Sequence, residues 1–297
     1  MLTGKAGIVT GAGGGIGAAI AKTLARYGAS VVVNDVGAQL DGTSLGKSPA
    51  EEVAAAIRQS GGRAVADTGS VTRAEDVHTL VDHCVYEFGR LDFAIHNAGI
   101  LRDKMFHKMT ESDWDDVVSV HLKGAFLLSR ACADVFKPQG RGALVHMTST
   151  SGLIGNLGQA NYASAKLGIV ALTRSIAMDM QRFGVRCNAV APFAWTRMTA
   201  SIPASDDPVQ RARIEKLKQC RPEHVAEAVA WLVSDAAQEV NGQVLSVRGD
   251  ELALFSLPRP QHRFVREGGW SASDLAQAWL EMRNDAVKLQ TSAEVMG

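Results

Sequence analysis

The chain has no excess of charge and no long apolar run. Lysines and arginines number 31, as do aspartates and glutamates, so the net charge is zero. A protein that binds polyanions carries a basic excess, and we therefore expect neither a nucleic acid nor an acidic membrane as a partner. No apolar stretch in the sequence approaches the ~18 residues that a membrane-spanning helix needs, so we expect no membrane span.

Cysteine and histidine are too scattered to suggest a metal site or a disulfide framework. The four cysteines form no C-x-x-C pair, and the eight histidines form no ligand cluster. We expect buried free thiols, a reducing cytoplasmic location and no catalytic metal. The same location is favoured because no secretory signal precedes the strand expected from Lys5, and because Val295-Met296-Gly297 is not a peroxisomal address.

The chain does contain a regular alternation of strand and helix patterns. Seven strands are expected at 5–10, 30–35, 63–67, 91–96, 142–148, 185–191 and 243–247. Helices are expected at 15–28, 49–60, 73–89, 111–136, 159–182 and 222–235. This order predicts one α/β catalytic domain over residues 1–250, with a doubly wound (Rossmann-type) seven-stranded parallel sheet and helices on both faces. Such sheets bind ligands at the carboxyl ends of their strands.

A glycine-rich turn joins the first strand to the first helix and contains Gly11, Gly15, Ile16 and Gly17. Glycine lets the backbone approach a pyrophosphate, and the helix N-terminus offers free N–H groups and the positive end of its dipole. The strand, turn and helix together predict the phosphate-binding element of a dinucleotide fold. A merely flexible turn is the alternative.

Asp35 ends the second expected strand, eighteen residues beyond Gly17. An acid at this spacing can accept hydrogen bonds from the ribose hydroxyls of an adenosine. Its charge would repel a 2′-phosphate, so Asp35 favours NAD over NADP. The alternative is an acid that only ends a strand.

Tyr162 and Lys166 lie four residues apart on an expected helix and therefore share one face. A free tyrosine ionises near pH ~10, but an adjacent ammonium group lowers the pKa of the phenol. The pair can then move a proton to or from an alcohol oxygen at neutral pH. Ser149 follows an apolar strand and could orient and polarise a carbonyl beside the tyrosine. Taken singly, such residues are also common on solvated helices and turns.

Together these residues resemble the short-chain dehydrogenase/reductase family over about residues 1–250. The matching motifs are Thr10-Gly11-x-x-x-Gly15-x-Gly17, Asn97-Ala98-Gly99, Ser149 and Tyr162-x-x-x-Lys166. The resemblance implies that Ser149 positions the substrate oxygen and that Tyr162 is the acid/base. It also implies that Lys166 lowers the pKa of Tyr162 and holds the nicotinamide ribose.

Further cofactor contacts are implied by the same resemblance. They come from Asn97, Ala98 and Gly99 along the cofactor, from the backbone of Ser70 and Val71 at the adenine, and from Pro192 and Thr196 at the nicotinamide. His121 stands where many members carry an asparagine, and it would hold a water of a proton relay. The alternative for His121 is a packed helix histidine.

A closer likeness is carried by segments 34–37, 97–103, 120–124 and 158–162. They resemble the (3R)-hydroxyacyl-CoA dehydrogenase unit of peroxisomal multifunctional enzyme type two and its free-standing bacterial relatives. The likeness implies NAD-dependent oxidation of a 3-hydroxyacyl thioester with a fatty-acyl or steroid side chain. The alternatives are a hydroxysteroid dehydrogenase acting on a free alcohol, a 3-oxoacyl reductase and a catalytically silent NAD(H) sensor. Asp35 argues against the reductase, because such enzymes usually use NADPH.

Two remaining segments concern the substrate and the assembly. Residues 197–221 are the expected substrate lid. An apolar acyl pocket is expected from Met105, Phe106, Met109, Leu153, Ile154, Leu157, Phe193 and Trp195. Residues 251–297 form a C-terminal extension with a helix at about 274–285, which we expect to pack on the same domain or on a neighbouring subunit. The family resemblance implies a homodimer or a homotetramer.

Overall fold

A computed structural model describes residues 1–37, 48–196, 214–215, 217–256 and 258–296. Most of the predicted lid at 197–221 lies outside these residues. Within them, none of the helices combines the length and apolarity that crossing a bilayer requires.

Eight strands form one sheet in the order β3-β2-β1-β4-β5-β6-β7-β8. They are β1 (Ala6–Thr10), β2 (Ser30–Asn34), β3 (Arg63–Asp67), β4 (Phe93–His96), β5 (Gly142–Met147), β6 (Val185–Phe193), β7 (Val244–Arg248) and β8 (Glu251–Leu254). The first seven strands pair in parallel, which confirms the predicted doubly wound fold.

The eighth strand corrects the predicted count of seven. β8 pairs antiparallel with β7 after a tight turn in which Gly249 has a φ of +56°. A left-handed residue of this kind suits glycine, which has no Cβ to clash. β8 is only four residues long, and its Leu252 and Leu254 are largely exposed, unlike the apolar residues of the strands that are buried on both faces.

The helices fall close to their predicted positions. They are α1 (Gly15–Arg26), α2 (Pro49–Gln59), α3 (Ala74–Phe88), α4 (Glu111–Val118), α5 (Gly124–Gln139), α6 (Thr150–Leu153), α7 (Ala160–Met180), α9 (Pro222–Leu232), α10 (Ala272–Met282) and α11 (Ser292–Met296). Short 3₁₀ turns occur at Phe106–Lys108, Gln181–Phe183 and Asp235–Ala237.

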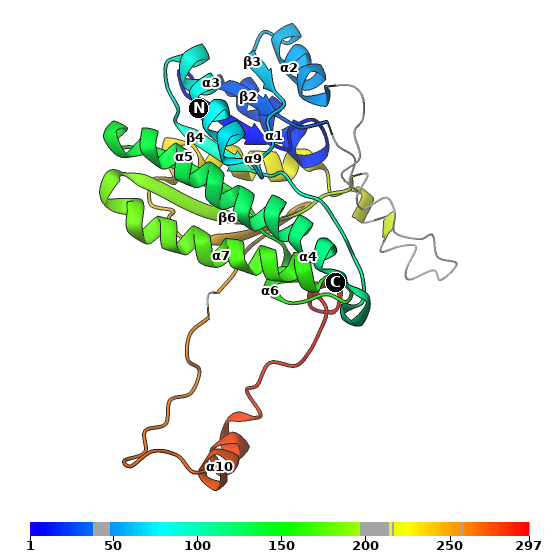
Figure 1. The fold of residues 1–297 in the computed structure, drawn as a ribbon, viewed down its shortest axis with the longest axis vertical. Coiled ribbons are helices and arrows are strands. Elements are labelled where there is room, and N and C mark those ends of the chain that lie inside the picture. Colours follow the sequence, from blue (N-terminus) through cyan, green and yellow to red (C-terminus); the bar gives the residue numbers. More distant parts are fainter. Residues whose placement is uncertain (38–47, 197–213, 216, 257, 297) are drawn as a thin grey trace.

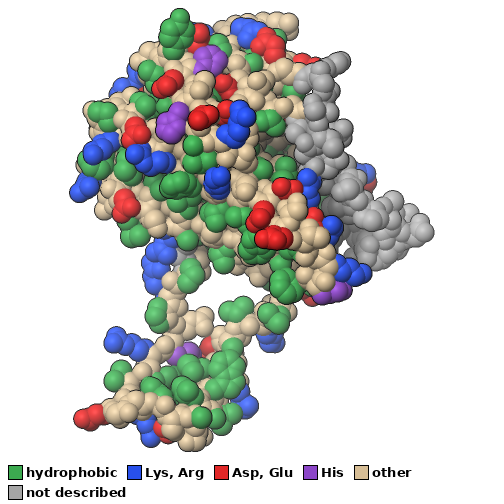
Figure 2. Space-filling view, viewed as in Figure 1, with side chains coloured by type: hydrophobic (Ala, Val, Ile, Leu, Met, Phe, Trp, Pro, Cys, Tyr) green, Lys and Arg blue, Asp and Glu red, His purple; other side chains and the backbone are tan. Residues whose placement is uncertain are grey.

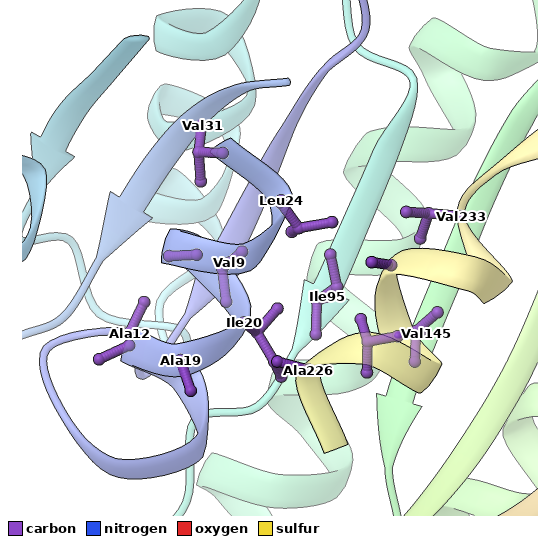
Figure 3. Packing of buried hydrophobic residues seen from close by; sticks show 14 of the residues in the cluster. Val9, Ala12, Ala19, Ile20, Leu24, Val31, Ile95, Val145, Ala226 and Val233 are labelled. Carbon is purple, nitrogen blue, oxygen red and sulfur yellow. The ribbon is translucent and has the colours of Figure 1, made fainter. Parts of the chain in front are cut away.

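The sheet separates two apolar clusters. Helices α1, α2 and α9 pack on one face, and Figure 3 shows α1 and α9 meeting over Val9, Ile95 and Val145. Helices α3, α5 and the end of α7 pack on the other face. Alternate residues of each strand point to opposite faces, so Ile8 joins the second cluster while Val9 joins the first. Burial on both faces explains why the central strands are almost entirely apolar.

The strand order reverses between β1 and β4, which lie side by side in the middle of the sheet (Figure 1). Gly11 and Asn97 directly follow the carboxyl ends of these two strands. Crevices for ligands form at this point in doubly wound sheets, because the connections leave the two strands on opposite sides. The fold therefore brings the predicted site residues to one edge.

The helix predicted at 111–136 is interrupted. Five residues, Ser119–Lys123, form a π-helical turn between α4 and α5. This wider turn directs His121 inward, where its Nε2 lies 2.8 Å from the carbonyl oxygen of Ile100. π turns frequently occur at functional sites, and this one underlies the loop that follows β4.

Three buried histidines affect stability in acid. Burial lowers the pKa of His96 to about 3 and that of His146 to about 4, and it lowers the pKa of His121 as well. His146 is held between the hydroxyl groups of Ser129 and Thr173, at 2.8 and 2.9 Å. A buried neutral imidazole resists protonation, whereas the same group in the unfolded chain accepts a proton below pH 6.5.

We predict that the protein loses stability as the pH falls from 6.5 toward 4. Because the unfolded state binds protons in this range, His146 alone should account for about 2 kcal/mol of the loss at pH 5. In urea unfolding at pH 7.5 and pH 5, His146→Gln should therefore lose less stability than the wild-type chain. His78→Gln, at an exposed histidine, is the control and should lose as much stability as the wild-type chain. Equal losses in the wild type and in His146→Gln would contradict this explanation.

Candidate active site

The glycine turn forms a cradle whose walls are backbone. Gly11 has a φ of +61°, and a Cβ there would lie 2.6 Å from the Cα of Ala98. A Cβ on Gly17 would collide with the carbonyl oxygen of Gly11. Gly15 has a φ of +51° and faces Thr196, whose Cγ2 would be 3.6 Å from an added Cβ. Gly11 and Gly17 thus let backbone segments pack closely, and of the three only Gly15 leaves room for a side chain. The turn lies at the N-terminus of α1, a place that suits a pyrophosphate.

Thr10 organises this cradle, a role that the motif beginning with it did not specify. Its hydroxyl oxygen accepts hydrogen bonds from the backbone of Asn97, at 3.1 Å, and of Ala98, at 3.2 Å. The side chain of Asn97 in turn donates to the carbonyl of Gly11 at 2.9 Å. These bonds join the loop after β1 to the loop after β4. The only signal in the sequence is a threonine at the end of a strand that precedes glycines.

Asp35 lies at the end of β2 with its carboxylate turned toward the cradle. One oxygen accepts from the backbone of Gly13 and the other from Gly37, both at 2.9 Å. The side chain is half-buried, so each oxygen keeps acceptor capacity for a ribose hydroxyl. The position therefore fits the adenosine ribose of a dinucleotide.

The predicted adenine contacts are placed less simply. The amide of Ser70 donates to Asp76 at 2.8 Å, so this amide is not available to an adenine. Of the two residues predicted to contact the adenine through their backbone, Val71 remains the candidate. Asp67, at the end of β3, accepts from Asn34 and Gly69. This carboxylate therefore organises the turn around it.

Ser149, Tyr162 and Lys166 meet where β5, α6 and α7 come together. Ser149 caps α6, with its hydroxyl oxygen accepting from the backbone of Ser151 at 3.1 Å. Lys166 is buried, and its Nζ donates to the carbonyl of Met147 at 2.6 Å and lies 5.4 Å from the centre of the Tyr162 ring. One turn of α7 thus brings the predicted pair to the end of the strand that carries the serine.

Burial opposes charge on both members of the pair. It raises the pKa of Tyr162 to about 12, although a hydrogen bond with Ser149 acts in the other direction. It lowers the pKa of Lys166 to about 7. The surrounding protein alone therefore holds the tyrosine neutral at physiological pH. A positive charge brought to this site would favour the phenolate.

His121 lies beside the tyrosine, with the two rings edge to face at 5.2 Å. Its Nε2 lies 2.8 Å from the carbonyl oxygen of Ile100 and 3.2 Å from the amide nitrogen of the same residue. Its Nδ1 is buried and has no hydrogen-bond partner among the described protein atoms. Such an unpaired group is costly unless something small and polar meets it.

Three of the side chains predicted to line an acyl pocket are exposed at the surface. Phe106 and Leu157, both predicted to line an acyl pocket, are 76% and 74% exposed, and Met105 is 50% exposed. Across the described residues, no three or more His, Cys, Asp or Glu side chains are grouped so that they could hold a metal ion.

Comparison with known proteins gives one family model and several close relatives. The model described as enoyl-(acyl carrier protein) reductase matches residues 11–249. The hydroxyacyl-CoA dehydrogenase ChsB1 of Mycobacterium tuberculosis is 41% identical over 283 residues, which is 92% of this chain and 87% of that protein. The peroxisomal multifunctional enzyme type 2 of Mus musculus is 42% identical over 264 residues, which is 89% of this chain but 34% of the mouse protein.

Two solved structures share the fold. A short chain dehydrogenase from Mycobacterium avium has a TM-score of 0.85 at 36% identity, and the match covers 98% of each chain. A 7α-hydroxysteroid dehydrogenase complexed with NADH and 7-oxo glycochenodeoxycholic acid has a TM-score of 0.74 at 31% identity. That match covers 84% of this chain and 94% of the other.

We predict that Asp35→Asn weakens the preference for NAD⁺ over NADP⁺. The substitution keeps the shape and one acceptor oxygen but removes the charge that repels a 2′-phosphate. The ratio of kcat/KM for the two cofactors should fall about tenfold or more, a change worth ~1.4 kcal/mol. Asp67→Asn, at the end of the neighbouring strand, is the matched control and should leave the ratio unchanged. An unaltered ratio in Asp35→Asn would exclude this role.

Proposed function

Since the chain belongs to the short-chain dehydrogenase/reductase family that its motifs predict, we propose that it oxidises the 3-hydroxyl group of a (3R)-hydroxyacyl-CoA with NAD⁺. One observation carries the chemistry: Ser149, Tyr162 and Lys166 converge beside the glycine cradle at one edge of the sheet. The cradle and Asp35 fit NAD, which, when bound, accepts a hydride from the substrate carbon.

Ser149, Tyr162 and Lys166 have different roles in the oxidation of the alcohol. The Ser149 hydroxyl donates to the substrate oxygen, and the substrate hydroxyl donates to the Tyr162 phenolate, so that the two bonds hold the substrate carbon toward the nicotinamide site. The Tyr162 phenolate then accepts the hydroxyl proton as the C–H bond breaks and the carbonyl forms. Lys166 in its ammonium form stabilises the phenolate and would hold the nicotinamide ribose of NAD. The positive charge of bound NAD⁺ would also lower the pKa of the Tyr162 phenol.

We assign His121 a part in returning that proton to solvent. Its unpaired Nδ1 and its place beside the Tyr162 ring support a bound water at this point. A water held there links the tyrosine to the exterior by hydrogen bonds. This use of the buried nitrogen explains why a polar ring lies under the loop that follows β4.

The substrate class rests on the relatives and on the surface around the site. One protein similar to this chain is named hydroxyacyl-CoA dehydrogenase. The exposed side chains of Met105, Phe106 and Leu157 offer contact to an apolar acyl chain, fatty or steroid. A free hydroxysteroid is the second candidate, because a 7α-hydroxysteroid dehydrogenase has the same fold over most of both chains.

We propose that the C-terminal extension packs against a second copy of the chain. The chain leaves the body after Phe255, whose amide donates to Val244, and returns at Ser292, whose amide donates to Gly155 at 2.8 Å. Residues 258–291, which we call the arm, project between these points (Figure 1). Figure 2 shows apolar side chains gathered on the arm, away from the body.

The arm has almost no core of its own. Its rings meet at Phe264 and Trp270, 6.5 Å apart, but Leu275 and Trp279 on α10 are about half exposed. A segment this short rarely stays folded in water without cover. We therefore propose a homodimer or homotetramer in which the arm packs on a neighbouring subunit. A cytoplasmic location is also proposed, since all four cysteines are buried free thiols that suit a reducing compartment.

The substrate assignment is tested by NADH formation. We expect turnover of (3R)-hydroxyacyl-CoA thioesters with NAD⁺, little with NADP⁺, and none of the 3S epimers. A free hydroxysteroid is assayed in parallel. Turnover of the free steroid alone would replace the proposal with the second candidate. Binding of NADH without turnover of any alcohol would indicate a sensor and overturn both.

We predict that Tyr162→Phe lowers kcat about a thousandfold, the range expected for loss of a general base. The ring keeps its packing, so the dissociation constant for NADH, measured by fluorescence, should stay within about twofold. Tyr86→Phe, at an exposed tyrosine on α3, is the matched control. Retention of most of the activity in Tyr162→Phe would refute the mechanism.

We predict that the pair of substitutions Leu275→Ser and Trp279→Ser weakens the assembly. These changes remove the apolar face of α10 and leave the anchors at Phe255 and Ser292 intact. Mass measured by light scattering over a dilution series should fall at concentrations where the wild type stays associated. Glu281→Gln on the same helix serves as the control. Unchanged mass and kinetics would show that the arm does not pack on a second copy.

A further inference from the structure

Two segments that the fold brings together flank the proposed base. Residues 102–104 follow β4, and residues 158–161 lead into α7. Lys104 donates its amide to the carbonyl of Gly158 at 2.8 Å. The Gln159 side chain donates to the carboxylate of Asp103 at 2.8 Å. The two segments are therefore joined at successive positions, immediately before Tyr162 in the chain.

The third connection comes from Asn161, which is fully buried. Its Nδ2 donates to the carbonyl of Arg102 at 3.1 Å and to the carbonyl of Asp113, in α4, at 2.8 Å. Its Oδ1 accepts from the backbone amide of Tyr162 at 2.8 Å. Both amide hydrogens and one oxygen lone pair are thus used, so a single side chain joins α7, α4 and the loop after β4.

The start of α7 needs such a connection. The first amides of a helix have no partner within the helix, and a side-chain cap usually satisfies one of them. The residue before α7, Gln159, makes no side-chain cap. Tyr162 is the third residue of the helix and therefore lies in the turn that would fray. The bond from the Tyr162 amide to Asn161 Oδ1 replaces the missing cap.

The same loop bears on the cofactor side of the site. It runs from Asn97 and Ala98, which are bonded to Thr10 under the cradle, through Ile100, which contacts His121. Asn161 donates a hydrogen bond to the same loop two residues further on, at the carbonyl of Arg102. The buried amide of Asn161 is thus one of the connections that hold the first turn of α7 against the loop bearing Asn97 and Ala98.

We infer that Asn161 is a positioning residue that holds the first turn of α7, and with it Tyr162, in register with the cofactor loop. It touches neither substrate nor cofactor and acts only through its neighbours. This inference rests on the proposed role of Tyr162 as the base. A displacement of about 1 Å at a reacting group can lower a rate about a hundredfold.

The test is Asn161→Asp, which keeps the shape and the acceptor for Tyr162 but sets carboxylate oxygens against two carbonyls. We expect kcat to fall about tenfold or more while KM for NAD⁺ changes less than about twofold. The isotope effect on kcat with substrate deuterated at the reacting carbon should rise, because hydride transfer becomes rate-limiting. A residue that only stabilises the fold would not change that isotope effect in folded protein.

The matched control is Asn188→Asp. Asn188 in β6 is equally buried and also uses its amide twice, donating to Val240 at 2.8 Å and accepting from Gln243 at 2.9 Å. This control should lower the melting temperature but leave kcat and the isotope effect unaltered. Wild-type kcat and isotope effect in folded Asn161→Asp, with Tyr162→Phe inactive, would overturn the inference and leave the function standing. An active Tyr162→Phe would instead overturn the function.

Two further variants decide the matter if Asn161→Asp does not fold. Gln159→Leu breaks the partly exposed bonds of this side chain to Asp103 and to Asn156 and leaves the buried amide of Asn161 in place. A smaller fall in kcat with a raised isotope effect would support the inference, because the same two segments are loosened. Wild-type values in folded Asn161→Ala, which removes the bonds to Arg102, Asp113 and the Tyr162 amide without burying a charge, would overturn it.

Discussion

The chemistry of this protein depends on the burial of an amine and a phenol at the end of one strand. Lys166 is 3% exposed, and burial brings its pKa to about 7, while the pKa of Tyr162 rises to about 12. Burial disfavours the charged form of both side chains. We infer that a positive charge entering the site promotes the phenolate that proton transfer needs. Base strength is in this way linked to the presence of the oxidised cofactor.

The sheet makes this burial possible and places the charge where it acts. Parallel strands packed on both faces carry Gly11, Asp35, Asn97 and Ser149 to a common edge. The bonds from Thr10 and Asn161 then fix the loops that leave those ends. Rigidity at this edge matters because hydride transfer requires the alcohol, the base and the nicotinamide to be aligned to within a fraction of an ångström.

The features that could be predicted from the sequence are those that depend on a short-range pattern of residues. Continuous apolar strands such as Val31–Val33 and the glycines before α1 indicate their structure locally, and Tyr162 and Lys166 share a helix face by spacing alone. The π turn at His121 could not be predicted, since it depends on the contact with Ile100 in another segment. The edge strand β8 has only four residues, too few to indicate a strand by pattern, and Thr10 and Asn161 acquire their roles through distant backbone partners. Residues whose function is to join segments carry no local signal.

The most direct test of this account is the ionisation of Tyr162 with and without NAD⁺. The chain has three tyrosines, so the ultraviolet difference between wild type and Tyr162→Phe isolates one phenol. We predict a pKa of about 12 for the free protein and a shift of several units toward neutrality with saturating NAD⁺. A pKa that stays near its value in the free protein when NAD⁺ is bound would contradict the claim that cofactor charge activates the base.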